Sequence, residues 1–583
     1  MWYNVPMEEI KKQLQNIFTK TIDDMIPDNH IVVTFSYPEN SLHGDIVSNI
    51  ALTMAKQTKK SSHEIATLLV EELRADPSLS TNIREVVQAG PGFINITFTD
   101  TFLINCLEAM SASITFNIIK ASTSGENILV EYAHPNTHKE FHIGHMRTLI
   151  TGEAISRILE ATGANVFRAN YQGDIGPHVA KALYGIKRLL QLEKLTLEEI
   201  QTYPGIKRAK FLGRAYALGS FEYEANKNEI DEINKKLYEK SKDIDTLYQI
   251  TRNWSLEYFS EIYNTFSTQF DKLFFESEMV NYGKEIVLKN SPNIFENDGG
   301  TYIFPGEKYG LHNRVFITKS GYPTYEGKEM ATAYREYEAF HFDRKIHIVA
   351  NEQQGYFQVV FKAIELLDPL KFKDKQFHVS MGMVTLIGRK MSSRTGDVLS
   401  IDNLIEEVKE KVSELFTAGK ISDKVRRTIV QQISLGAVKY SILKVSTGKN
   451  VAFDIEKSVA LEGNSGPYLQ YTYARTYSLL EKSDKNITIN FKNYKLNHEE
   501  REVIRHLLWY EEIVRICAEE LNTSLICEYL YQLAKLFNHF YQKHQIISKD
   551  DEVTSFRLCL TNVVSKTLKN GLYLLGIDAP IQM

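Results

Sequence analysis

The sequence predicts an α/β protein in which a parallel-sheet domain lies between a smaller N-terminal α/β unit and a helical C-terminal third. Three observations support this fold class. From about residue 120, short apolar runs alternate with segments of helical periodicity, as expected for parallel strands joined by helices. Before that region, residues 1–115 combine helical patterns with the alternating run at 93–98. After about residue 400 the strand patterns end, and helical periodicity continues to residue 583.

Size and composition indicate an ordinary globular protein with several domains. A chain of 583 residues holds roughly three to five domains, and 43% hydrophobic with 24% charged residues is typical of a globular chain. The net charge of −5 argues against a protein coated in positive charge, so any nucleic acid must meet local basic patches. Charged residues interrupt the apolar positions near the N-terminus, and no run of 18 apolar residues occurs. We therefore expect neither a secretory signal nor a membrane span.

The cysteines indicate the compartment. None of them has CxxC spacing, so we expect buried thiols in a reducing environment at Cys106, Cys517, Cys527 and Cys559. A cytoplasmic location without membrane contact follows from these observations.

The N-terminal unit is predicted to begin with a helix over residues 7–22, where apolar positions have helical spacing. A strand is expected at 31–35, and helices are expected near 46–57 and 61–74. The Gly-Pro-Gly turn that follows leads into the strand at 93–98.

The stretch at 130–147, VEYAHPNTHKEFHIGHMR, lies where the parallel-sheet domain begins. Residues 128–132 are predicted to form a buried strand, and 146–161 an amphipathic helix that ends before Gly163. A strand that passes through a glycine-containing turn into a helix creates an anion site. The site binds anions because the first N–H groups of the helix and the positive end of the helix dipole face the anion.

Two histidines and a glycine at this turn extend the anion site. His142 and His145 add donors, and Gly144 has no side chain to keep a flat base away. The tetrapeptide at 142–145 resembles the HIGH signature of class I aminoacyl-tRNA synthetases. The longer string P-N-x-x-K-E-x-H-I-G-H-x-R is similar to that of arginyl-tRNA synthetases. Far downstream, K-M-S-S-R at 390–394 resembles the second class I signature, KMSKS.

A metal site is an alternative use of the histidines. His134, His138 and His142 are spaced four residues apart, as ligands on one helix face would be. Pro135 interrupts and Gly144 ends any helix there, and no cysteine or carboxylate pair completes a tetrahedral set. We therefore expect no protein-bound metal.

The resemblance covers essentially the whole chain and implies its domain organisation. The H-G-D-x-x-x-N and A-G-P-G-F-I-N strings are similar to the N-terminal added domain of the family, which contacts the D-loop of the tRNA. The catalytic domain is expected to be a class I Rossmann-like parallel sheet with strands at 165–170, 314–317 and 345–349. The expected units are an N-terminal domain (1–115), a catalytic domain (116–400) with a helical connective insertion (about 187–300), a linking helical stem-contact region (401–454) and a helical anticodon-binding domain (455–583).

The family's reaction explains the polar residues of both motifs. ATP activates L-arginine to arginyl-adenylate with release of pyrophosphate, and arginine then passes to the 3′ end of tRNA(Arg). Protein groups mainly position the reactants and neutralise charge on the transferring phosphoryl group. Magnesium is expected to accompany ATP, bound mainly by phosphate oxygens. The residues expected to be catalytic are Lys139, His142, His145, Lys390 and Arg394. ATP contacts are expected at His142, Gly144, His145, Lys390, Met391, Ser392 and Ser393.

The KMSKS-like loop lacks one cation, because Ser393 stands where the class has its second lysine. Arg394 is one position along on the same loop, and Lys139 lies three residues before His142. Arginyl enzymes without the loop lysine resemble this chain in carrying a lysine just upstream of HIGH, which favours Lys139. Both substitutes stay open.

The resemblance also implies how arginine is recognised. A guanidinium is planar, always charged and best matched by carboxylates. Glu131 and Glu329 are expected to supply them, with Glu329 replacing the usual Asp of the family's Y-x-x-x-D. The other expected contacts are Tyr325, Asn136 and Gln353. His134 replaces a family serine, and its role stays open.

Binding of tRNA is expected on both flanking domains. Asn49 and Phe93 are the candidates in the N-terminal unit. In the helical third, exposed tyrosines are candidates for stacking on bases of the anticodon end, namely Tyr471, Tyr473 and Tyr477. The expected partners are tRNA(Arg), L-arginine and ATP, and a monomer is favoured over an oligomer.

Three other functions compete with a complete synthetase. A non-catalytic tRNA-binding paralogue would explain the imperfect KMSKS-like loop, but the intact HIGH motif opposes it. A free-standing nucleotidyltransferase would leave the N-terminal unit and the helical third without a purpose. Another class I specificity, such as lysine, also matches a cation-binding carboxylate pair. ATP-dependent charging of total tRNA with each amino acid separates the four.

Overall fold

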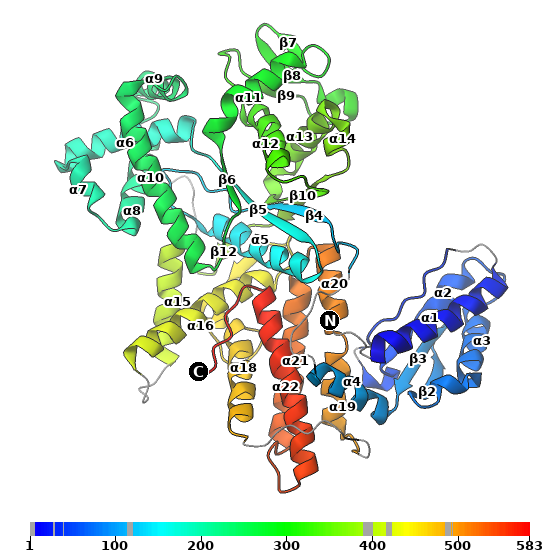
Figure 1. The fold of residues 1–583 in the computed structure, drawn as a ribbon. Helices are drawn as coiled ribbons and strands as arrows, with labels where there is room; N and C mark the ends of the chain where they lie inside the picture. Colours follow the sequence, from blue (N-terminus) through cyan, green and yellow to red (C-terminus); the bar gives the residue numbers. More distant parts are fainter. Residues whose placement is uncertain are drawn as a thin grey trace.

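The structure is a computed structural model of the 583-residue chain, and it describes residues 6–26, 30–38, 40–112, 121–388, 400–415, 422–483, 491 and 494–583. A parallel sheet occupies the middle of the molecule (Figure 1). Helices inserted between its strands lie on one side of it, and a bundle formed by the C-terminal helices lies on the other. The N-terminal domain stands beside that bundle.

The central sheet contains five parallel strands in the order β11-β10-β4-β5-β6. The chain enters in the middle at β4, proceeds outward through β5 and β6, and then crosses to the other side of β4. Ligands of such doubly wound sheets bind where the order reverses, at the carboxyl ends of the strands. The predicted α/β class with a parallel sheet is confirmed. The strands are β4 (Asn127–Glu131), β5 (Asn165–Gln172), β6 (Lys272–Phe275), β10 (Arg344–Ala350) and β11 (Gln376–Met381).

Two strand assignments made from the sequence are wrong. The segment 314–317, expected in the central sheet, is β9 of a separate antiparallel sheet of order β7-β8-β9. The central strand β6 lies instead inside 187–300, the segment expected to be a helical insertion. Its four residues K-L-F-F are too few to show a strand period. The small sheet comprises β7 (Glu296–Asp298), β8 (Thr301–Phe304) and β9 (Arg314–Ile317).

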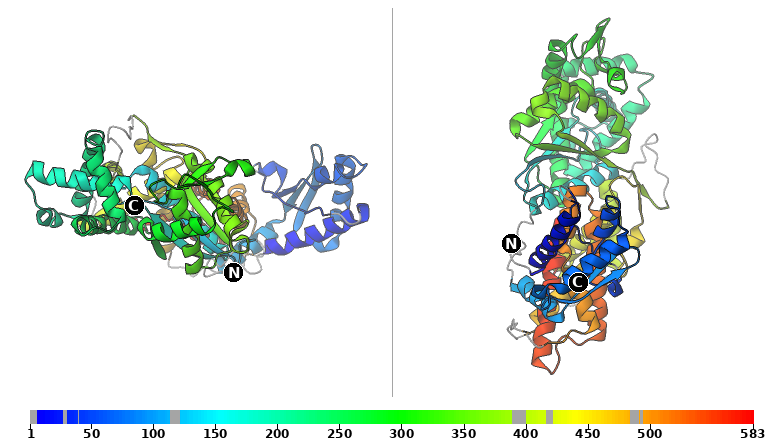
Figure 2. Two further views of the ribbon diagram at one scale, coloured as in Figure 1. Left: turned by 90° about the horizontal axis from the view of Figure 1, so that it is seen from above. Right: turned by 90° about the vertical axis from the view of Figure 1, so that its right-hand side faces the viewer.

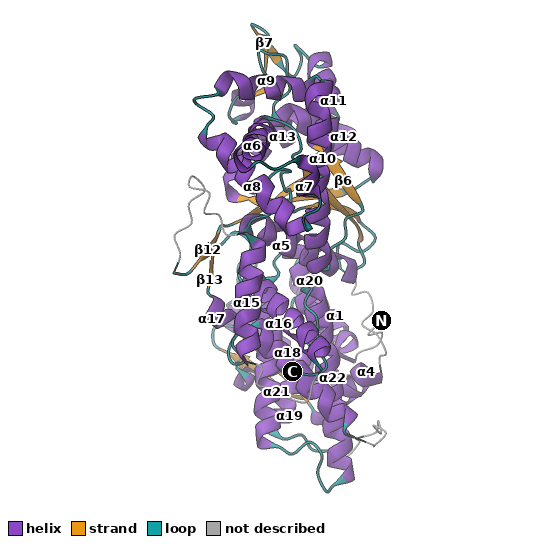
Figure 3. Ribbon diagram, turned by 90° about the vertical axis from the view of Figure 1, so that its left-hand side faces the viewer, coloured by secondary structure: helices purple, strands orange, loops and turns teal. Residues whose placement is uncertain are grey.

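A short parallel pair joins the catalytic part to the helical part. β12 (Val384–Leu386) pairs with β13 (Val451–Phe453), which lies after residue 400, where only helices were expected. Figure 3 shows the pair between the sheet region and the helices of the bundle.

Helices cover the sheet in two groups with different cores. The inserted helices pack around their own buried apolar cluster, whereas a second cluster lies between the central sheet and the helices that follow β6. The first group is α6 (Pro177–Glu193), α7 (Leu197–Gln201), α8 (Gly205–Phe221), α9 (Lys227–Tyr238) and α10 (Lys242–Thr265). The second is α11 (Glu276–Lys289), α12 (Tyr325–Ala339), α13 (Gln354–Leu367) and α14 (Pro369–Phe372).

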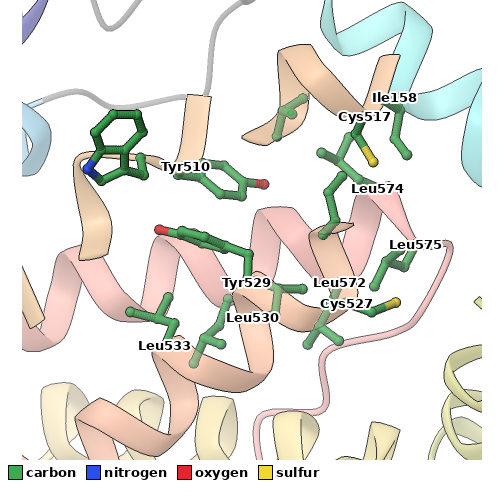
Figure 4. Packing of buried hydrophobic residues seen from close by; sticks show 14 of the residues in the cluster. Ile158, Tyr510, Cys517, Cys527, Tyr529, Leu530, Leu533, Leu572, Leu574 and Leu575 are labelled. Atoms are coloured by element: carbon green, nitrogen blue, oxygen red, sulfur yellow. The ribbon is translucent and has the colours of Figure 1, made fainter. Parts of the chain in front are cut away.

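The helix α5 (Ile143–Ala161) connects the sheet to the C-terminal bundle. It is buried on nearly all sides, and its Ile158 lies close to Cys517 and Leu574 of the bundle (Figure 4). All four cysteines are buried free thiols. The bundle comprises α15 (Ile401–Leu415), α16 (Asp423–Leu443), α17 (Ile455–Ser458), α18 (Gly466–Glu481), α19 (His498–Leu507), α20 (Tyr510–Glu520), α21 (Ser524–Lys543) and α22 (Asp551–Leu574).

The N-terminal domain packs helices on an antiparallel sheet of order β1-β3-β2. The strand predicted at 31–35 is wrong, because this segment forms no strand and only Ser36 makes a bridge, to Val47. The elements are α1 (Pro6–Met25), β1 (Ile46–Ser48), α2 (Ile50–Ala55), α3 (Ser62–Ala75), β2 (Ile83–Ala89), β3 (Phe93–Phe98) and α4 (Asp100–Ala112). Short 3-10 helices in the described chain are η1 (Ser41–His43), η2 (Pro77–Leu79), η3 (Gly306–Tyr309) and η4 (Asn351–Gln353).

The H-G-D string of the sequence docks this domain onto the bundle. The buried carboxylate of Asp45 lies 2.6 Å from Nη2 of Arg501 and 2.7 Å from Nε of Arg505, both on α19. Truncating one partner of such a buried ion pair strongly destabilises a protein, because a charge is left without compensation. This contact therefore fixes the place of the N-terminal domain, which projects to one side of the bundle (Figure 2).

Candidate active site

A cavity of about 640 Å³ opens at the carboxyl ends of the central strands. This is the edge at which parallel sheets bind ligands. Residues following four different strands line it, together with two residues of α12. Among them are His134 and Asn136 after β4, Tyr171 and Gly173 at the end of β5, Glu276 after β6, Val349 and Gln353 at the end of β10, and Tyr325 and Lys328 of α12; the start of α6, the helix α9 and the segment 318–324 complete the lining.

The connection from β4 to α5 is held in an unusual backbone conformation. Ala133, His134 and His138 all have positive φ angles, of 78°, 52° and 62°. Side chains disfavour this left-handed region, at a cost of about 1–3 kcal/mol for each residue. Neighbouring contacts must therefore over-determine the connection, which is typical of functional sites.

A cluster of buried carboxyl groups lies beneath one wall of the cavity. Glu131 of β4 lies 2.6 Å from the ammonium of Lys345 on β10, and Glu336 of α12 pairs with the same ammonium. Glu329, two helical turns before Glu336 on α12, is also buried. Burial raises the pKa of Glu131, but Lys345 and His347 together hold it below its usual value. Two of the three carboxyl groups thus pair with the same lysine.

Glu329 is the carboxyl group of this cluster that lacks a cation. Burial and then Glu131 raise its pKa to about 8. Its Oε1 has no hydrogen-bond partner among the described residues, and neither do the buried hydroxyl groups of Tyr171 and Tyr356. The Tyr325 hydroxyl is hydrogen-bonded to the Glu329 carboxyl, and the Tyr325 ring stacks on Tyr356 with ring centroids 5.1 Å apart. Unpaired acceptors and hydroxyls in one buried place suit a ligand that carries several N–H donors.

Glu131 and Glu329 do not themselves line the cavity. Tyr325 covers Glu329, and His134 covers Glu131 with Nδ1 3.4 Å from Oε1. Burial lowers the pKa of His134, so this imidazole is neutral. The histidine in place of the family serine therefore shields the carboxylate from the cavity. Sequence reasoning missed Lys345, whose position in an apolar strand signals a buried charge that requires a partner.

Asn136 and Gln353 both line the cavity, and they follow the neighbouring strands β4 and β10, between which the strand order reverses. Asn136 forms a bridge with Gly173, and a Cβ atom on Gly173 would lie 2.2 Å from Oδ1 of Asn136. Glycine at 173 is therefore required for this placement. Sequence reasoning also missed the ion pair between Glu276 and Lys328 in the wall.

At the start of α5, His142 caps the helix with its own side chain. Its Nδ1 accepts from the backbone N–H groups of Gly144 (3.1 Å) and His145 (3.4 Å), and the two imidazole rings stack with centroids 3.6 Å apart. The first amides of the helix, expected to face a phosphate, are therefore occupied by His142 in this structure. A Cβ atom on Gly144 would lie 3.0 Å from the His142 ring, so glycine permits the cap.

Both histidines act as neutral groups. Burial, with a contribution from Lys139, lowers the pKa of His142 to about 4, and burial together with His142 lowers the pKa of His145 well below its usual value. Because Nδ1 of His142 accepts hydrogen bonds, its proton resides on Nε2, which remains a donor. The pair can supply N–H groups to an anion but no charge.

Among the described residues, Lys139 is a lysine whose charge acts on both histidines. Its ammonium lies 4.3 Å from the ring centroid of Tyr216 on α8, within the range of a cation–π contact. The KMSKS-like residues Lys390, Met391, Ser392, Ser393 and Arg394 lie outside the described residues.

His138 is a packing residue. It is fully buried, with Nδ1 2.9 Å from Oγ1 of Thr137 and Nε2 2.9 Å from Oγ1 of Thr251. The described part of the chain contains no group of three potential metal ligands.

Three family models match the chain in the order of its domains. The arginyl tRNA synthetase N-terminal domain matches residues 8–98, the catalytic domain of class I tRNA synthetases (R) matches 110–455, and the DALR anticodon binding domain matches 469–583. The chain belongs to the arginyl-tRNA synthetase family. It is accordingly a class I ligase that activates arginine with ATP and charges tRNA(Arg). Membership of this family opposes the alternatives of a nucleotidyltransferase without tRNA and of a lysine enzyme.

Relatives span the whole synthetase. Arginine–tRNA ligase of Flavobacterium psychrophilum is 31% identical over 520 residues, which are 84% of this chain and 85% of the relative. That of Borrelia hermsii is 30% identical and covers 98% of both chains. The solved arginyl-tRNA synthetase of Thermus thermophilus shares the fold, with a TM-score of 0.82, 23% identity and coverage of 98% of this chain and 100% of that chain.

The surface residues expected to bind tRNA differ in exposure. Asn49 is exposed at the start of α2, and the register of β1 with β3 brings it to the same end of the sheet as Phe93, which is 38% exposed. On α18 of the synthetase, Tyr471 is 37% exposed, but Tyr473 is only 3% exposed. The expectation that Tyr473 faces solvent is wrong, because it lies on the core side of α18.

A second exposed tyrosine accompanies Tyr471. The guanidinium of Arg475 lies 4.8 Å from the ring centroid of Tyr471 and 4.9 Å from that of Tyr541 on α21. Tyr477 is half-buried and packs beside Tyr473. Sequence reasoning missed Tyr541, which comes from a helix distant in sequence.

Proposed function

We propose that this synthetase binds the arginine guanidinium against the carboxyl cluster of Glu131, Glu329 and Glu336 beneath the cavity wall. The observation that carries this proposal is that, among the described residues, Lys345 pairs with Glu131 and Glu336, whereas Glu329 has no cation. Buried charges are stable only when paired. An arriving guanidinium supplies the second cation, and its planar N–H groups match both a carboxylate and the neighbouring hydroxyls.

Each expected arginine contact then has a separate task. Glu329 accepts from the guanidinium, and Tyr325 orients the Glu329 carboxyl. Glu131 acts mainly through charge, because its own carboxylate already pairs with Lys345. Asn136 and Gln353 hold the α-amino and α-carboxylate groups at the cavity mouth.

ATP binds at the start of α5, where the His142 side chain already accepts from the N–H groups of Gly144 and His145 and Gly144 leaves room beside the ring. Nε2–H of His142 and the neutral His145 donate to phosphate oxygens, while Lys139 and the loop residues Lys390, Met391, Ser392, Ser393 and Arg394 supply the remaining contacts and positive charge. Magnesium arrives with ATP, bound mainly by phosphate oxygens.

The reaction requires the α-carboxylate of arginine to approach the α-phosphorus in line. A new O–P bond forms while the bond to pyrophosphate breaks, and negative charge grows on the departing oxygens. The 3′ hydroxyl of tRNA then attacks the carbonyl carbon, and AMP departs. Side chains of the chain position these groups and stabilise developing charge.

The flanking domains bind tRNA(Arg). Residues 1–115 contact the D-loop through Asn49 and Phe93, residues 401–454 contact the stem, and 455–583 read the anticodon end. Tyr471 and Tyr477 remain the stacking candidates, and Tyr541 joins them beside Arg475. Tyr473 supports the helix from the core side. We further propose a cytoplasmic monomer. Among the described residues, no helix combines the length and apolar character that crossing a bilayer requires.

The central test is ATP-dependent charging of total tRNA with each amino acid in turn. Arginine alone should be attached, and the Glu329→Gln variant should lose this activity at low arginine concentration. Attachment of lysine at a similar rate would contradict the guanidinium pocket. For tRNA, Tyr471→Ala should raise the tRNA KM about fivefold or more, because stacking contributes about 1–3 kcal/mol, whereas Tyr473→Phe should not.

A further inference from the structure

Arg147 lies in the first turns of α5, two residues after the HIGH tetrapeptide, and is 2% exposed. Its guanidinium donates to four main-chain carbonyl oxygens. Nη1 lies 2.5 Å from the oxygen of Gly382 and 3.1 Å from that of Met383, and Nη2 lies 2.9 Å from Thr447 and 2.7 Å from Lys449. Burial lowers the pKa of Arg147 to about 10, so the side chain is charged at neutral pH.

The four carbonyls belong to two segments far apart in sequence. Gly382 and Met383 join β11 to β12, the strand that precedes residues 390–394. Thr447 and Lys449 belong to the loop 446–450, which connects α16 of the helical part to β13. Arg147 therefore joins the HIGH helix to the two segments that lead into β12 and β13.

The two segments are also bonded tightly to each other. The Gly382 N–H donates to Thr447 (3.0 Å), the Val451 N–H donates to Met383 (2.8 Å), and the Met383 N–H donates to Oδ1 of Asn450 (2.8 Å). A Cβ atom on Gly382 would lie 2.5 Å from the backbone carbonyl of Lys449. The two segments are therefore packed so closely that a side chain at residue 382 would collide with the backbone of Lys449.

Burying a guanidinium among carbonyls is a costly way to stabilise a fold, because burial removes its water and no carboxylate of the described residues forms an ion pair with it. Its rigid fork is, however, suited to fixing several acceptors in one geometry. In this protein the buried guanidinium lies where α5 contacts the segment before β12. His142 and His145 are at the start of α5, and β12 precedes the K-M-S-S-R residues 390–394.

We propose that Arg147 is a positioning residue for amino-acid activation: it fixes the backbone at 382–383 and 446–450 relative to His142 and His145. The proposal rests on the proposed ATP site at the start of α5. The loop 446–450, which belongs to the helical part, would then help to support the catalytic centre. A displacement of about 1 Å in such a scaffold can lower a rate by about a hundredfold.

The test measures arginine-dependent pyrophosphate exchange by the full-length protein, with tRNA present. Arg147→Gln should lower kcat about tenfold to a hundredfold, while the KM for arginine stays within about twofold, because the carboxyl cluster does not touch Arg147. Arg147→Lys should recover part of kcat, since an ammonium can still bond to some of the carbonyls. Gly382→Ala, which disturbs the same junction from the other side, should reproduce the kcat loss even where Arg147→Gln fails to fold.

Two controls separate positioning from general destabilisation. Arg157→Gln removes another arginine of α5 that donates to carbonyls, those of Tyr573 and Ser267, and should leave kcat near normal. Gly448→Ala adds a Cβ atom in open space within the same loop and should also be neutral.

The outcomes are decisive in either direction. Normal kcat in folded Arg147→Gln and in Gly382→Ala would overturn the proposal, as would an equal loss in the two controls. His142→Ala serves as the reference for the ATP site. If His142→Ala is crippled while Arg147→Gln is normal, only the positioning role fails; if His142→Ala is normal, the proposed ATP site itself fails.

Discussion

The carboxyl cluster and the histidine pair of the candidate site lie at the same edge of one sheet, but one consists of acidic groups and the other of neutral groups. At the amino-acid end, Glu131, Glu329 and Glu336 are buried around Lys345, and the cluster carries more carboxyl groups than cations. At the proposed ATP end, His142 and His145 are half-buried, and their lowered pKa values leave both neutral.

This difference follows from what each ligand must undergo. Arginine keeps its charge throughout the reaction, so a fixed cluster of carboxyl groups, in which Glu329 ionises as the guanidinium binds, can select it before any chemistry begins. Phosphate charge moves during the reaction. Neutral N–H donors, together with a separate cation, can stabilise the charge distribution of the transition state more than that of bound ATP. The amino-acid end should therefore control KM, and the ATP end should control kcat.

The most severe way to break the amino-acid end is Glu329→Gln. Removing one partner of a desolvated charge pair costs about 2–5 kcal/mol, so the KM for arginine should rise roughly 30-fold to a few thousandfold. The KM for ATP should change little in pyrophosphate exchange. Glu131→Gln should act in the same direction. Glu338→Gln, an exposed carboxylate on the same helix, is the matched control, and an unchanged arginine KM in Glu329→Gln and Glu131→Gln would refute the pocket.

At the ATP end, Lys139→Ala should lower the activation rate by about 10²–10³-fold, the loss found when one transition-state donor is removed. Arginine and ATP KM values should move much less, because the contact strengthens as charge develops. Lys181→Ala is the control, since Lys181 makes a similar contact with Tyr223 at 4.1 Å. A crippled Arg394→Ala beside a normal Lys139→Ala would assign the missing cation to the loop.

The pH dependence of arginine binding sharpens the contrast. With a pKa of about 8, Glu329 is mostly protonated at pH 7 in the free protein, and guanidinium binding favours its ionised form. Binding must then release a proton below pH 8. Affinity should fall about tenfold for each pH unit below 8 and level off above it. This slope should vanish in Glu329→Gln, and a flat profile in the unsubstituted protein would show that another group pairs with arginine.

The smallest effect is expected at the ATP end under the same titration. Because His142 has a pKa of about 4 and His145 is likewise neutral, neither titrates between pH 7 and 9. At saturating arginine, kcat should change by less than about twofold from these groups. An ionisation near pH 7 that disappears in His142→Asn would mean that the imidazole acts as a cation.

Local patterns predicted much of this molecule. The strand, turn and helix around His142 formed as expected, because a buried apolar run followed by a glycine-containing turn and helical spacing involves only neighbours in sequence. The parallel sheet followed from the same periodicity. The family resemblance led to the cavity residues Asn136, Tyr325 and Gln353. Resemblance rather than periodicity identified them, since three separated residues carry no common local signal.

What only the tertiary structure decided is which groups meet. Whether the strand at 314–317 joins the central sheet depends on partner strands, and a tetrapeptide pattern does not encode a partner. Burial of Tyr473 beside exposed Tyr471 depends on how α18 rotates against its neighbours. The ammonium of Lys345 became the shared partner of Glu131 and Glu336, and Arg147 joined segments more than 200 residues away, as its partners Gly382 and Lys449 show. Such contacts arise from packing between distant elements, where shape and charge balance, not sequence spacing, select the partner.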